Sequence, residues 1–269
     1  MIALQARRIA SGAVLSVIAV TYMAAGTSFA ADAEWRPAPR TTWQWQLSGP
    51  VDMNVDAQVY DIDLFDTPQE TIDALHFANR RVVCHFSAGS YEVRRPDAAS
   101  FPRRVRGDSL DPPYASERWL DIRKAAVRRV MEDRLDLAAS KQCDGVEPDH
   151  LDGYENDTGF NLKVRDQRAY NRFIAQEAHE RHLAVGLKNN AEQARTLEPA
   201  FDFAVVEQCF EFEECRRYQA FVDGGKAVFA VEYDANPAEF CPAAAERGFS
   251  AILKQLDVGA PLVACPTGG

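Results

Sequence analysis

The chain has 269 residues and a formal net charge of −10 at pH 7, with 46% hydrophobic and 26% charged residues. This charge argues against a nucleic acid partner, because phosphates would be repelled without a basic face, whereas a cationic substrate would be attracted. The length allows one sizeable hydrophobic core and lies within the range of a single α/β barrel.

The first 30 residues have the pattern of a secretory signal peptide. Arg7 and Arg8 precede an apolar run from about residue 9 to residue 25, and Ser28-Phe29-Ala30 is a small-x-small cleavage pattern. A retained membrane anchor is the alternative, but the run is short and its residues are small for a spanning helix. We expect cleavage and a secreted protein, extracellular or periplasmic, without stable membrane insertion.

The mature chain is predicted to form one domain. Residues 31–40 are polar with two prolines and are expected to form a flexible segment before a catalytic domain over residues 41–269. No later run is apolar for long enough to cross a bilayer. We expect this domain to be a monomer.

Six cysteines follow the predicted cleavage site, where an oxidising compartment favours disulfides. Six cysteines allow fifteen pairings. The short spacing between Cys209 and Cys215 favours a local bridge, which leaves the pairs Cys84/Cys143 and Cys241/Cys265. Metal binding by these thiols is less favoured because no C-x2-C pair is present, and we expect neither a metal nor another cofactor.

From residue 41 on, short runs rich in Val, Ile and aromatic residues alternate with stretches of helical period. This alternation predicts βα units around a parallel sheet and, with eight such runs, a single (β/α)8 TIM barrel. The eight predicted strands cover residues 43–47, 59–64, 82–87, 145–149, 183–188, 203–207, 228–232 and 251–256.

Helix signals separate these strands. Thr67-Pro68-Gln69-Glu70 predicts a capping box with Pro at the first helical position, and Asn236-Pro237-Ala238-Glu239 repeats the pattern. Apolar residues recur at helical spacing over residues 127–135 and 170–178, as in helices that pack on a core. Residues 91–114 are rich in Arg and Pro without clear period, and we expect an extended loop at the active-site face.

In a parallel barrel the reactive groups lie at the carboxyl ends of the strands. The polar residues at these positions are unusually acidic: Asp61, Asp63, Ser87, Glu147, Asp149, Asp152, Lys188, Asn189, Glu207, Gln208, Glu232, Tyr233 and Asp234. Converging carboxylates suit glycosidic cleavage, which needs one acid to protonate the leaving oxygen and one carboxylate to stabilise or trap the oxocarbenium centre. Aromatic residues able to stack on sugar rings lie nearby, at Trp45, Tyr60, Tyr154 and Tyr233.

The block from Asp144 to Tyr154, DGVEPDHLDGY, resembles the D-G-(V/I)-(E/D)-P-D-N-x-D-(G/A)-Y signature of the endo-α-1,4-polygalactosaminidase family, glycoside hydrolase family 114. Further segments are similar to that family over about residues 41–257: Trp43-Gln44-Trp45-Gln46-Leu47, Tyr60-Asp61-Ile62-Asp63, Cys84-His85-Phe86-Ser87-Ala88-Gly89, Gly186-Leu187-Lys188-Asn189, Glu207-Gln208-Cys209 and Leu253-Lys254-Gln255. One departure is His150, where the family pattern has Asn.

The resemblance implies a (β/α)8 barrel with Asp149 and Glu207 as the catalytic pair, at the ends of the fourth and sixth strands. We expect Asp149 to attack the anomeric carbon while Glu207 protonates the leaving oxygen and then activates water, with retention of configuration. The implied substrate is an α-1,4-linked galactosamine polysaccharide, cationic or partly acetylated. Its ammonium groups could pair with Asp61, Asp63, Asp152 or Glu232.

Other substrate contacts are expected from Trp45, Ser87, Glu147, Tyr154, Lys188, Asn189, Gln208 and Tyr233. Glu147 points the same way along its strand as Asp149 and is an alternative working acid. A non-catalytic sugar-binding barrel would keep the aromatic residues and the acidic cleft without a working pair. A metal-dependent deacetylase would use His85 and His150 with nearby acids. His179-Glu180-Arg181-His182 lacks the spacing of a metalloprotease helix and is expected to be helix surface.

Overall fold

The structure, a computed structural model, describes residues 35–267. Its strands are β1 (Trp43–Gln46), β2 (Val59–Asp63), β3 (Arg81–Ser87), β4 (Ser90–Tyr91), β5 (Arg106–Ser109), β6 (Arg118–Leu120), β7 (Gly145–Asp149), β8 (Ala184–Lys188), β9 (Phe203–Glu207), β10 (Val228–Glu232), β11 (Ser250–Leu253) and β12 (Val263–Ala264). Its α-helices are α1 (Gln69–Phe77), α2 (Ala125–Ser140), α3 (Val164–Glu180), α4 (Ala194–Leu197), α5 (Gln219–Asp223) and α6 (Pro237–Arg247). Short 3-10 helices lie at Ala98–Ser100, Arg103–Val105, Gly153–Glu155, Glu198–Ala200 and Cys215–Tyr218.

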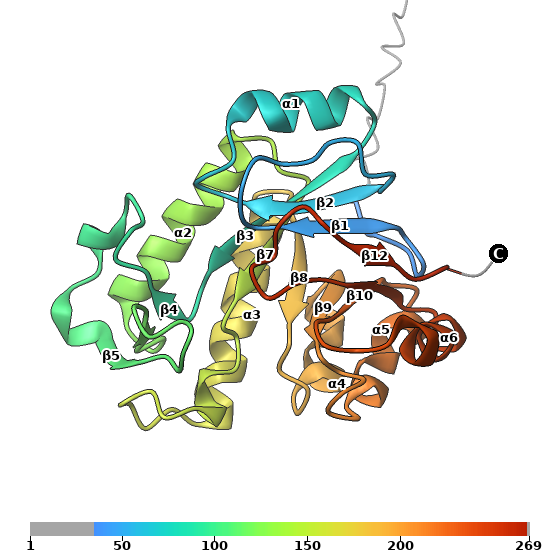
Figure 1. Ribbon diagram of the computed structural model, residues 1–269. Helices are drawn as coiled ribbons and strands as arrows, with labels where there is room; N and C mark the ends of the chain where they lie inside the picture. Colours follow the sequence, from blue (N-terminus) through green and yellow to red (C-terminus); the bar gives the residue numbers. More distant parts are fainter. Residues whose placement is uncertain (1–34, 268–269) are drawn as a thin grey trace, which may run out of the picture. The chain divides into compact units, whose positions relative to one another are not determined.

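All eight predicted strands are present, and each begins within one residue of its predicted start. They pair in parallel in the order β1-β2-β3-β7-β8-β9-β10-β11, and β12 adds antiparallel to β11. The sheet is therefore one curled layer in which consecutive βα units lie side by side (Figure 1). This arrangement gathers the carboxyl ends of all eight strands on one face.

The prediction of a closed (β/α)8 barrel is confirmed only in part. Within residues 35–267 no strand ladder joins β11 to β1, and no helix follows either strand. The segment after β11 bridges this seam instead: the Leu47 and Ser48 amides donate to the Val258 carbonyl at 3.0 and 3.3 Å, and the Gln44 side chain donates to Ala260 at 2.8 Å. The sheet is thus a curled α/β layer whose two edges meet through a loop.

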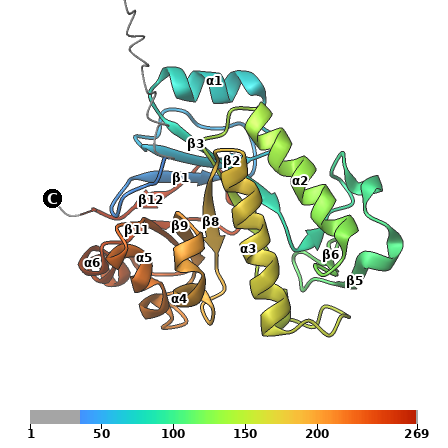
Figure 2. The same cartoon turned by 180° about the vertical axis from the view of Figure 1, so that it is seen from behind.

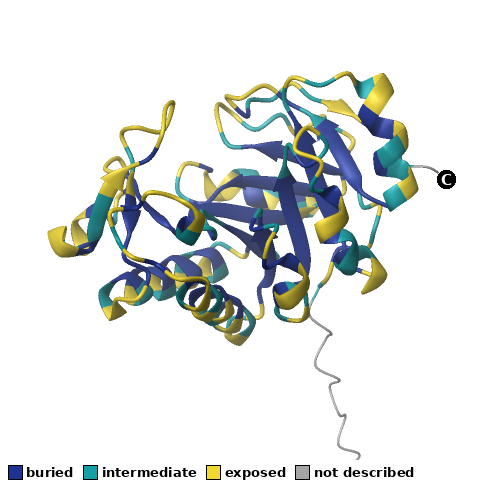
Figure 3. Cartoon of the chain, turned by 90° about the horizontal axis from the view of Figure 1, so that it is seen from below, coloured by how far each residue is buried: buried dark blue, intermediate teal, exposed yellow. Residues whose placement is uncertain are grey.

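The core has two sides. Helices α1, α2 and α3 cover the outer face of the sheet, with α2 and α3 next to each other (Figure 2). On the inner side the aromatic rings of Trp43, Phe203 and Phe229 pack together, with centroids 4.9 and 5.7 Å apart. Because both faces are covered, the eight parallel strands are buried along most of their length, while the helices expose mainly their outer stripes (Figure 3).

Of the two predicted capping boxes, only the second forms its cap. Pro68 itself occupies the cap position of α1 and no side chain caps that helix, because the chain enters it one residue later than predicted. At α6 the Asn236 side chain accepts a hydrogen bond from the Ala238 amide at 3.1 Å, with Pro237 at the first position.

We expect Asn236→Ala to lower the free energy of unfolding by about 1 kcal/mol, because one amide of the first turn loses its acceptor. Urea denaturation would measure the change. Asn236→Asp keeps the acceptor and should retain the stability of the parent protein, so an equal loss in both variants would contradict the capping role.

Residues 91–114, expected to be an extended loop, contain regular structure. Strands β4, β5 and β6 form a small antiparallel sheet in the order β4-β6-β5, and two 3-10 helices lie between β4 and β5. The strands are two to four residues long and mostly polar, which is why no periodicity signals them. Since β4 follows β3 after two residues, this small sheet lies at the carboxyl end of the main sheet.

Residues 35–40, expected to be flexible, contact the folded domain. The Pro37 carbonyl accepts from the Ala227 amide at 2.8 Å, and Arg36 pairs with Asp202 at 2.8 Å. The predicted signal peptide and residues 31–34 lie outside the described residues. Within the described part of the chain, no helix is long and apolar enough to span a bilayer.

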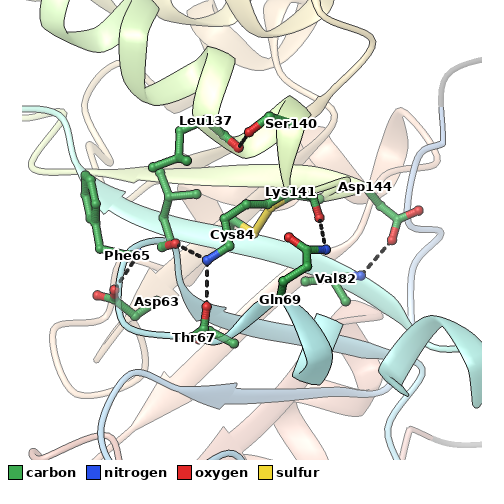
Figure 4. Close-up of a disulfide and its surroundings, with 12 residues drawn as sticks. Asp63, Phe65, Thr67, Gln69, Val82, Cys84, Leu137, Ser140, Lys141 and Asp144 are labelled. Carbon is green, nitrogen blue, oxygen red and sulfur yellow. Dashed lines mark hydrogen bonds between the residues drawn. A yellow bond between two sulfur atoms is a disulfide. The ribbon is translucent and has the colours of Figure 1, made fainter. Parts of the chain in front are cut away.

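The three predicted disulfides are confirmed: Cys84–Cys143, Cys209–Cys215 and Cys241–Cys265. The first joins β3 to the residues just before β7 (Figure 4). Beside it, the Lys141 ammonium donates to the carbonyls of Leu64 and Thr67 at 2.7 and 2.6 Å. The turn after α2 is thus held to β3 by a covalent bond and to the segment between β2 and α1 by the ammonium of Lys141.

Candidate active site

A cavity of about 440 Å³ opens at the carboxyl ends of the strands. The predicted site residues that line it are Trp45, Asp63, Ser87, Asp149, Asp152, Lys188, Asn189 and Glu207. Residues from six of the main strands, or from positions shortly after them, therefore meet in one place, as the parallel topology predicts.

Lys188, the last residue of β8, lies at the centre of the site and is fully buried. Its ammonium lies 2.9 Å from Glu147, 3.3 Å from Asp149 and 3.3 Å from Glu207, and 4.6 Å from the centroid of the Trp45 ring. Burial alone would lower the pKa of Lys188, but the three carboxylates raise it well above its usual value. Lys188 is thus a fixed cation shared by three acids.

Glu147 lies below the cavity and has no exposed surface. It accepts a hydrogen bond from Nδ1 of His85 and pairs with Lys188. Burial would lower the pKa of His85, yet the charge and the hydrogen bond of Glu147 raise it to about 9. At neutral pH His85 is therefore cationic, and Glu147 is held between two cations.

Asp149, the last residue of β7, faces the cavity. Its Oδ1 accepts from the His150 amide at 2.7 Å and lies 3.3 Å from the Lys188 ammonium, whereas Oδ2 is 3.7 Å from Nδ1 of His150. Burial would raise the pKa of Asp149, but the charges of His150, Lys188 and His85 hold it well below its usual range. The carboxyl group is ionised, with one oxygen bound and the other outside hydrogen-bonding distance of His150.

The backbone of this segment is fixed by a close approach at Gly89. The Ala88 and Gly89 amides donate to the Asp149 carbonyl at 2.8 and 3.1 Å. A Cβ atom at Gly89 would lie 2.0 Å from the His150 carbonyl oxygen, so no other residue fits without moving that strand end.

Glu207, the last residue of β9, is bound by three neighbours. Its Oε2 accepts from the Asn189 side chain at 3.1 Å and lies near Lys188, while Tyr233 donates to its Oε1. The Asn189 side chain also accepts from the Glu207 amide at 2.9 Å. Burial and the negative charge of Glu207 raise the pKa of Tyr233, so the phenol remains a donor.

Three strand ends have unusual backbone geometry. His150, Asn189 and Gln208, which directly follow β7, β8 and β9, have φ values of 60°, 47° and 55°. Non-glycine residues adopt this left-handed region at an energetic cost, and such residues cluster at functional sites. Here the sharp turns direct the chain away from each strand immediately after its polar side chain.

Several predicted ammonium partners are engaged elsewhere. Asp63 is bound by the Arg95 guanidinium through both oxygens, at 2.9 and 2.6 Å. Asp61 is buried outside the cavity lining, where burial and then the charge of Glu147 raise its pKa well above the usual value. Glu232 accepts from the Phe210 amide at 2.9 Å and braces the loop after β9. Asp63 and Asp152 line the cavity, and of these only Asp152 is not bound by an arginine; burial raises the pKa of Asp152 to about 6.

The remaining predicted residues lie at the border of the site. Gln208 lines a second cavity of about 440 Å³ that shares Asp152, Asn189 and Glu207 with the first. Tyr154 lines neither cavity, because its hydroxyl donates to Glu155 at 2.5 Å. Trp45 is only 2% exposed and forms part of the cavity floor rather than an open stacking platform.

The predicted position of residues 91–114 at the active-site face is confirmed, but the sequence did not show which side chains of residues 91–117 form the cavity wall. Glu92, Arg94, Arg95, Pro113, Tyr114 and Glu117 line the cavity. The signal was the length of this segment, which directly follows a strand end, but nothing in its sequence indicated which side chains turn inward.

The histidines near the strand ends are not arranged around a metal. Within residues 35–267 no group of three or more His, Cys, Asp or Glu side chains has a geometry that could hold an ion. His85 is hydrogen-bonded to Glu147 and His150 to Ser87. His179 pairs with Asp202 at 2.7 Å on the helix surface. These contacts give the metal-dependent deacetylase hypothesis no support.

Comparison with known proteins agrees with the geometry. A sequence model of glycoside-hydrolase family GH114 matches residues 24–268. The crystal structure of Aspergillus fumigatus Ega3 in complex with galactosamine has a TM-score of 0.82 at 39% sequence identity, over 87% of this chain and 98% of that chain. The glycoside hydrolase domain of PelA from Pseudomonas aeruginosa has a TM-score of 0.64 at 12% identity, over 83% and 97%. A search of curated protein sequences finds no match.

The similarity to PelA shows the shared fold alone, because the identity is low. The match to Ega3 covers 87% of the chain at an identity that shows common family membership. The family model covers residues 24–268, and the resemblance noted in the sequence motifs is confirmed. The chain is a glycoside hydrolase and belongs to family GH114.

Proposed function

We propose that the protein is a secreted, endo-acting and retaining hydrolase of α-1,4-linked galactosamine polysaccharides, in which Asp149 is the nucleophile and Glu207 the general acid and base. In this proposal the leader is removed on export, and the mature enzyme works as a monomeric, closed barrel. Three disulfides favour an oxidising compartment. The observation that carries the catalytic assignment is the shared position of Asp149 and Glu207 around Lys188, at the cavity surface.

Accessibility favours Asp149 over Glu147 as the nucleophile. A nucleophile must reach the anomeric carbon, and Asp149 lines the cavity with an ionised carboxylate. Glu147 has no exposed surface and is paired with His85 and Lys188. In this assignment Glu147 orients Lys188, which in turn positions the two working acids.

Position favours Glu207 as the proton donor. With Asp149 as the nucleophile, Glu207 is the other carboxylate beside Lys188 that lines the cavity, so it can reach the leaving oxygen. Tyr233 and Asn189 donate to its two oxygens, which fixes the plane of the carboxyl group. After proton transfer, the same two donors stabilise the carboxylate that must activate water.

The spacing around Lys188 supports retention. Asp149 Oδ1 and Glu207 Oε2 each lie 3.3 Å from the same nitrogen, so they are at most twice that distance apart. This upper limit of about 6.6 Å lies at the lower end of the roughly 6.5–9.5 Å found in inverting enzymes and includes the roughly 5–5.5 Å of retaining ones. Asp149 would attack from one face while Glu207 protonates the oxygen leaving from the other.

The substrate class follows from charge. The cavity wall carries Asp152 and Glu117 besides the catalytic pair, and the whole chain has a net charge of −10. An amino sugar with a free ammonium group would be attracted to such a site. Galactosamine is the ligand named for the similar Ega3 structure. The second cavity, which continues past Glu207, gives room for sugars on both sides of the cleaved bond and supports endo action.

Incubation with a partly deacetylated α-1,4-galactosamine polymer should release a mixture of oligosaccharides, because both cavities hold sugar. Mass spectrometry would identify the products, and proton NMR during the first minutes should detect the α-anomer at the new reducing ends. Release of monosaccharide alone would contradict endo action, and a first-formed β-anomer would contradict retention. A folded enzyme that leaves this polymer intact but cleaves another glycan would overturn the substrate.

A further inference from the structure

A chain of hydrogen bonds leads from the nucleophile's neighbour to a carboxylate on the cavity wall. Nδ1 of His150 lies 3.0 Å from the Ser87 hydroxyl, which lies 2.7 Å from the Ser90 hydroxyl, which donates to Glu117 at 2.5 Å. Ser87 and Ser90 are 2% and 0% exposed, so water does not compete with these contacts. The chain joins β3, β4, β7 and the segment before β6 at one end of the cavity.

The direction of each hydrogen bond follows from counting donors. A carboxylate only accepts, so the single hydroxyl proton of Ser90 points to Glu117. The Ser87 hydroxyl must then donate to Ser90, and it also accepts from the Ser90 amide at 3.0 Å. The Ser87 oxygen therefore has only a lone pair to offer to Nδ1 of His150, so Nδ1 must carry the proton of this hydrogen bond.

This proton lies next to the nucleophile. Oδ1 of Asp149 is bound by the His150 amide and Lys188, and Oδ2 is the oxygen left to attack. Nδ1 of His150 is 3.7 Å from Oδ2, too far for a hydrogen bond but close enough for its partial charge to act. The Ser87 hydroxyl keeps the N–H from turning onto Oδ2, and the close approach of Gly89 fixes the backbone that carries both residues.

We propose that Glu117 is a positioning residue that acts through Ser90 and Ser87 to fix the proton of His150 on Nδ1. The N–H dipole of His150 then lies near the attacking oxygen of Asp149, while its hydrogen bond to Ser87 prevents it from bonding to that oxygen. The effect on turnover rests on the proposed function of Asp149. This hydrogen-bond chain depends on His150, which occupies a position where the family pattern has Asn.

Nitrogen-15 NMR of the ring-labelled protein tests the proton position without any substrate. The chain has five histidines, and the signal that disappears in His150→Asn is that of His150. At a pH where this ring is neutral, we expect the Nδ1–H tautomer in the parent protein. In Ser90→Ala the Ser87 hydroxyl loses its acceptor and can donate to Nδ1, so the signal should change to that of the Nε2–H tautomer.

Kinetics tests the consequence for Asp149. Ser90→Ala should lower kcat about tenfold with little change in KM, since Ser90 is buried away from the sugar and the nucleophile then faces a lone pair. Glu117→Gln keeps an acceptor oxygen for Ser90, so the ring of His150 should keep its Nδ1–H tautomer in this variant. Ser100→Ala, at an exposed position outside the chain of hydrogen bonds, is the matched serine control.

The two readouts separate the inference from the proposed function. An Nε2–H tautomer in the parent protein, or an unchanged kcat in Ser90→Ala, would overturn the positioning role of Glu117. A parent protein with the Nδ1–H tautomer that does not cleave the galactosamine polymer would overturn the proposed substrate and confirm the hydrogen-bond chain.

Discussion

Asp149→Asn is expected to lower the rate of polymer cleavage by about 10⁴-fold, and Glu207→Gln by roughly 10²–10⁴-fold. The first variant removes the atom that would bond to the anomeric carbon, and the second removes the proton that the leaving oxygen needs. Mass spectrometry of released oligosaccharides would measure both. Since each side chain lies at the cavity surface, the folded proteins should have circular dichroism spectra like that of the parent.

Azide can then assign the two roles separately. With a substrate carrying an activated leaving group, azide should take the place of the missing carboxylate in Asp149→Ala and form a β-glycosyl azide. In Glu207→Ala it should attack the glycosyl-enzyme from the opposite face and form an α-glycosyl azide. The reverse pattern would exchange the two assignments.

The buried residue Glu147 provides the matched control for these variants. Glu147→Gln also removes a carboxylate of the group, but azide cannot reach this position below the cavity floor. We therefore expect no azide product from it. Rescue of this variant by azide would move the nucleophile from Asp149 to Glu147.

Lys188→Met is expected to lower the free energy of unfolding by about 3–5 kcal/mol at neutral pH, because it leaves buried carboxylates without their cation. Lys188 pairs with Glu147, Asp149 and Glu207 and is fully buried. Chemical denaturation of both proteins would measure the difference. Turnover should also fall, since Asp149 loses one of the charges that keep it ionised.

The free energy of unfolding lost in Lys188→Met should decrease as the pH falls. In the parent protein Asp149 has a lowered folded pKa, so its contribution is present above the unfolded pKa and disappears as the pH falls through the folded value. Without Lys188 the folded carboxylates bind protons more readily, and acid relieves the repulsion. The destabilisation by Lys188→Met should therefore shrink as the pH falls.

Lys254→Met is the matched control. Lys254 is buried and its ammonium donates to the oxygen atoms of Gln44 and Gly259 rather than to a carboxylate. Burial lowers the pKa of Lys254 to about 8. Its removal leaves no buried charge unpaired, so we expect a clearly smaller loss than for Lys188→Met. Equal losses in the two variants would show that packing, rather than charge, explains the effect.

The sequence was sufficient for the strands and for the centre of the site. Runs such as residues 203–206 and 228–231 are buried on both faces and therefore continuously apolar, which makes these strands recognisable from a single sequence. Parallel pairing then brings strand ends together whatever their separation in the chain. Asp149, Lys188 and Glu207 could thus be placed around one cavity from their positions in the strand pattern alone.

The features that the sequence did not predict depend on contacts with distant segments of the chain. Asp63 has the same position at a strand end as Asp149, yet Arg95 engages it, and nothing before the fold shows that these residues meet. The small sheet of β4, β5 and β6 is too short and polar to leave a periodic signal. The seam between β1 and β11 likewise depends on a loop whose residues carry no strand pattern.

The disulfide between Cys84 and Cys143 bears on how the enzyme can be produced. It spans 59 residues and joins β3, which carries His85 and Ser87, to the segment that enters β7 with Glu147 and Asp149. Closing a loop of that length restricts the unfolded chain by about 4 kcal/mol. Synthesis in a reducing cytoplasm would forgo this contribution in the two strands that carry His85, Glu147 and Asp149, whereas production in an oxidising compartment would allow the bridge to form as the chain folds.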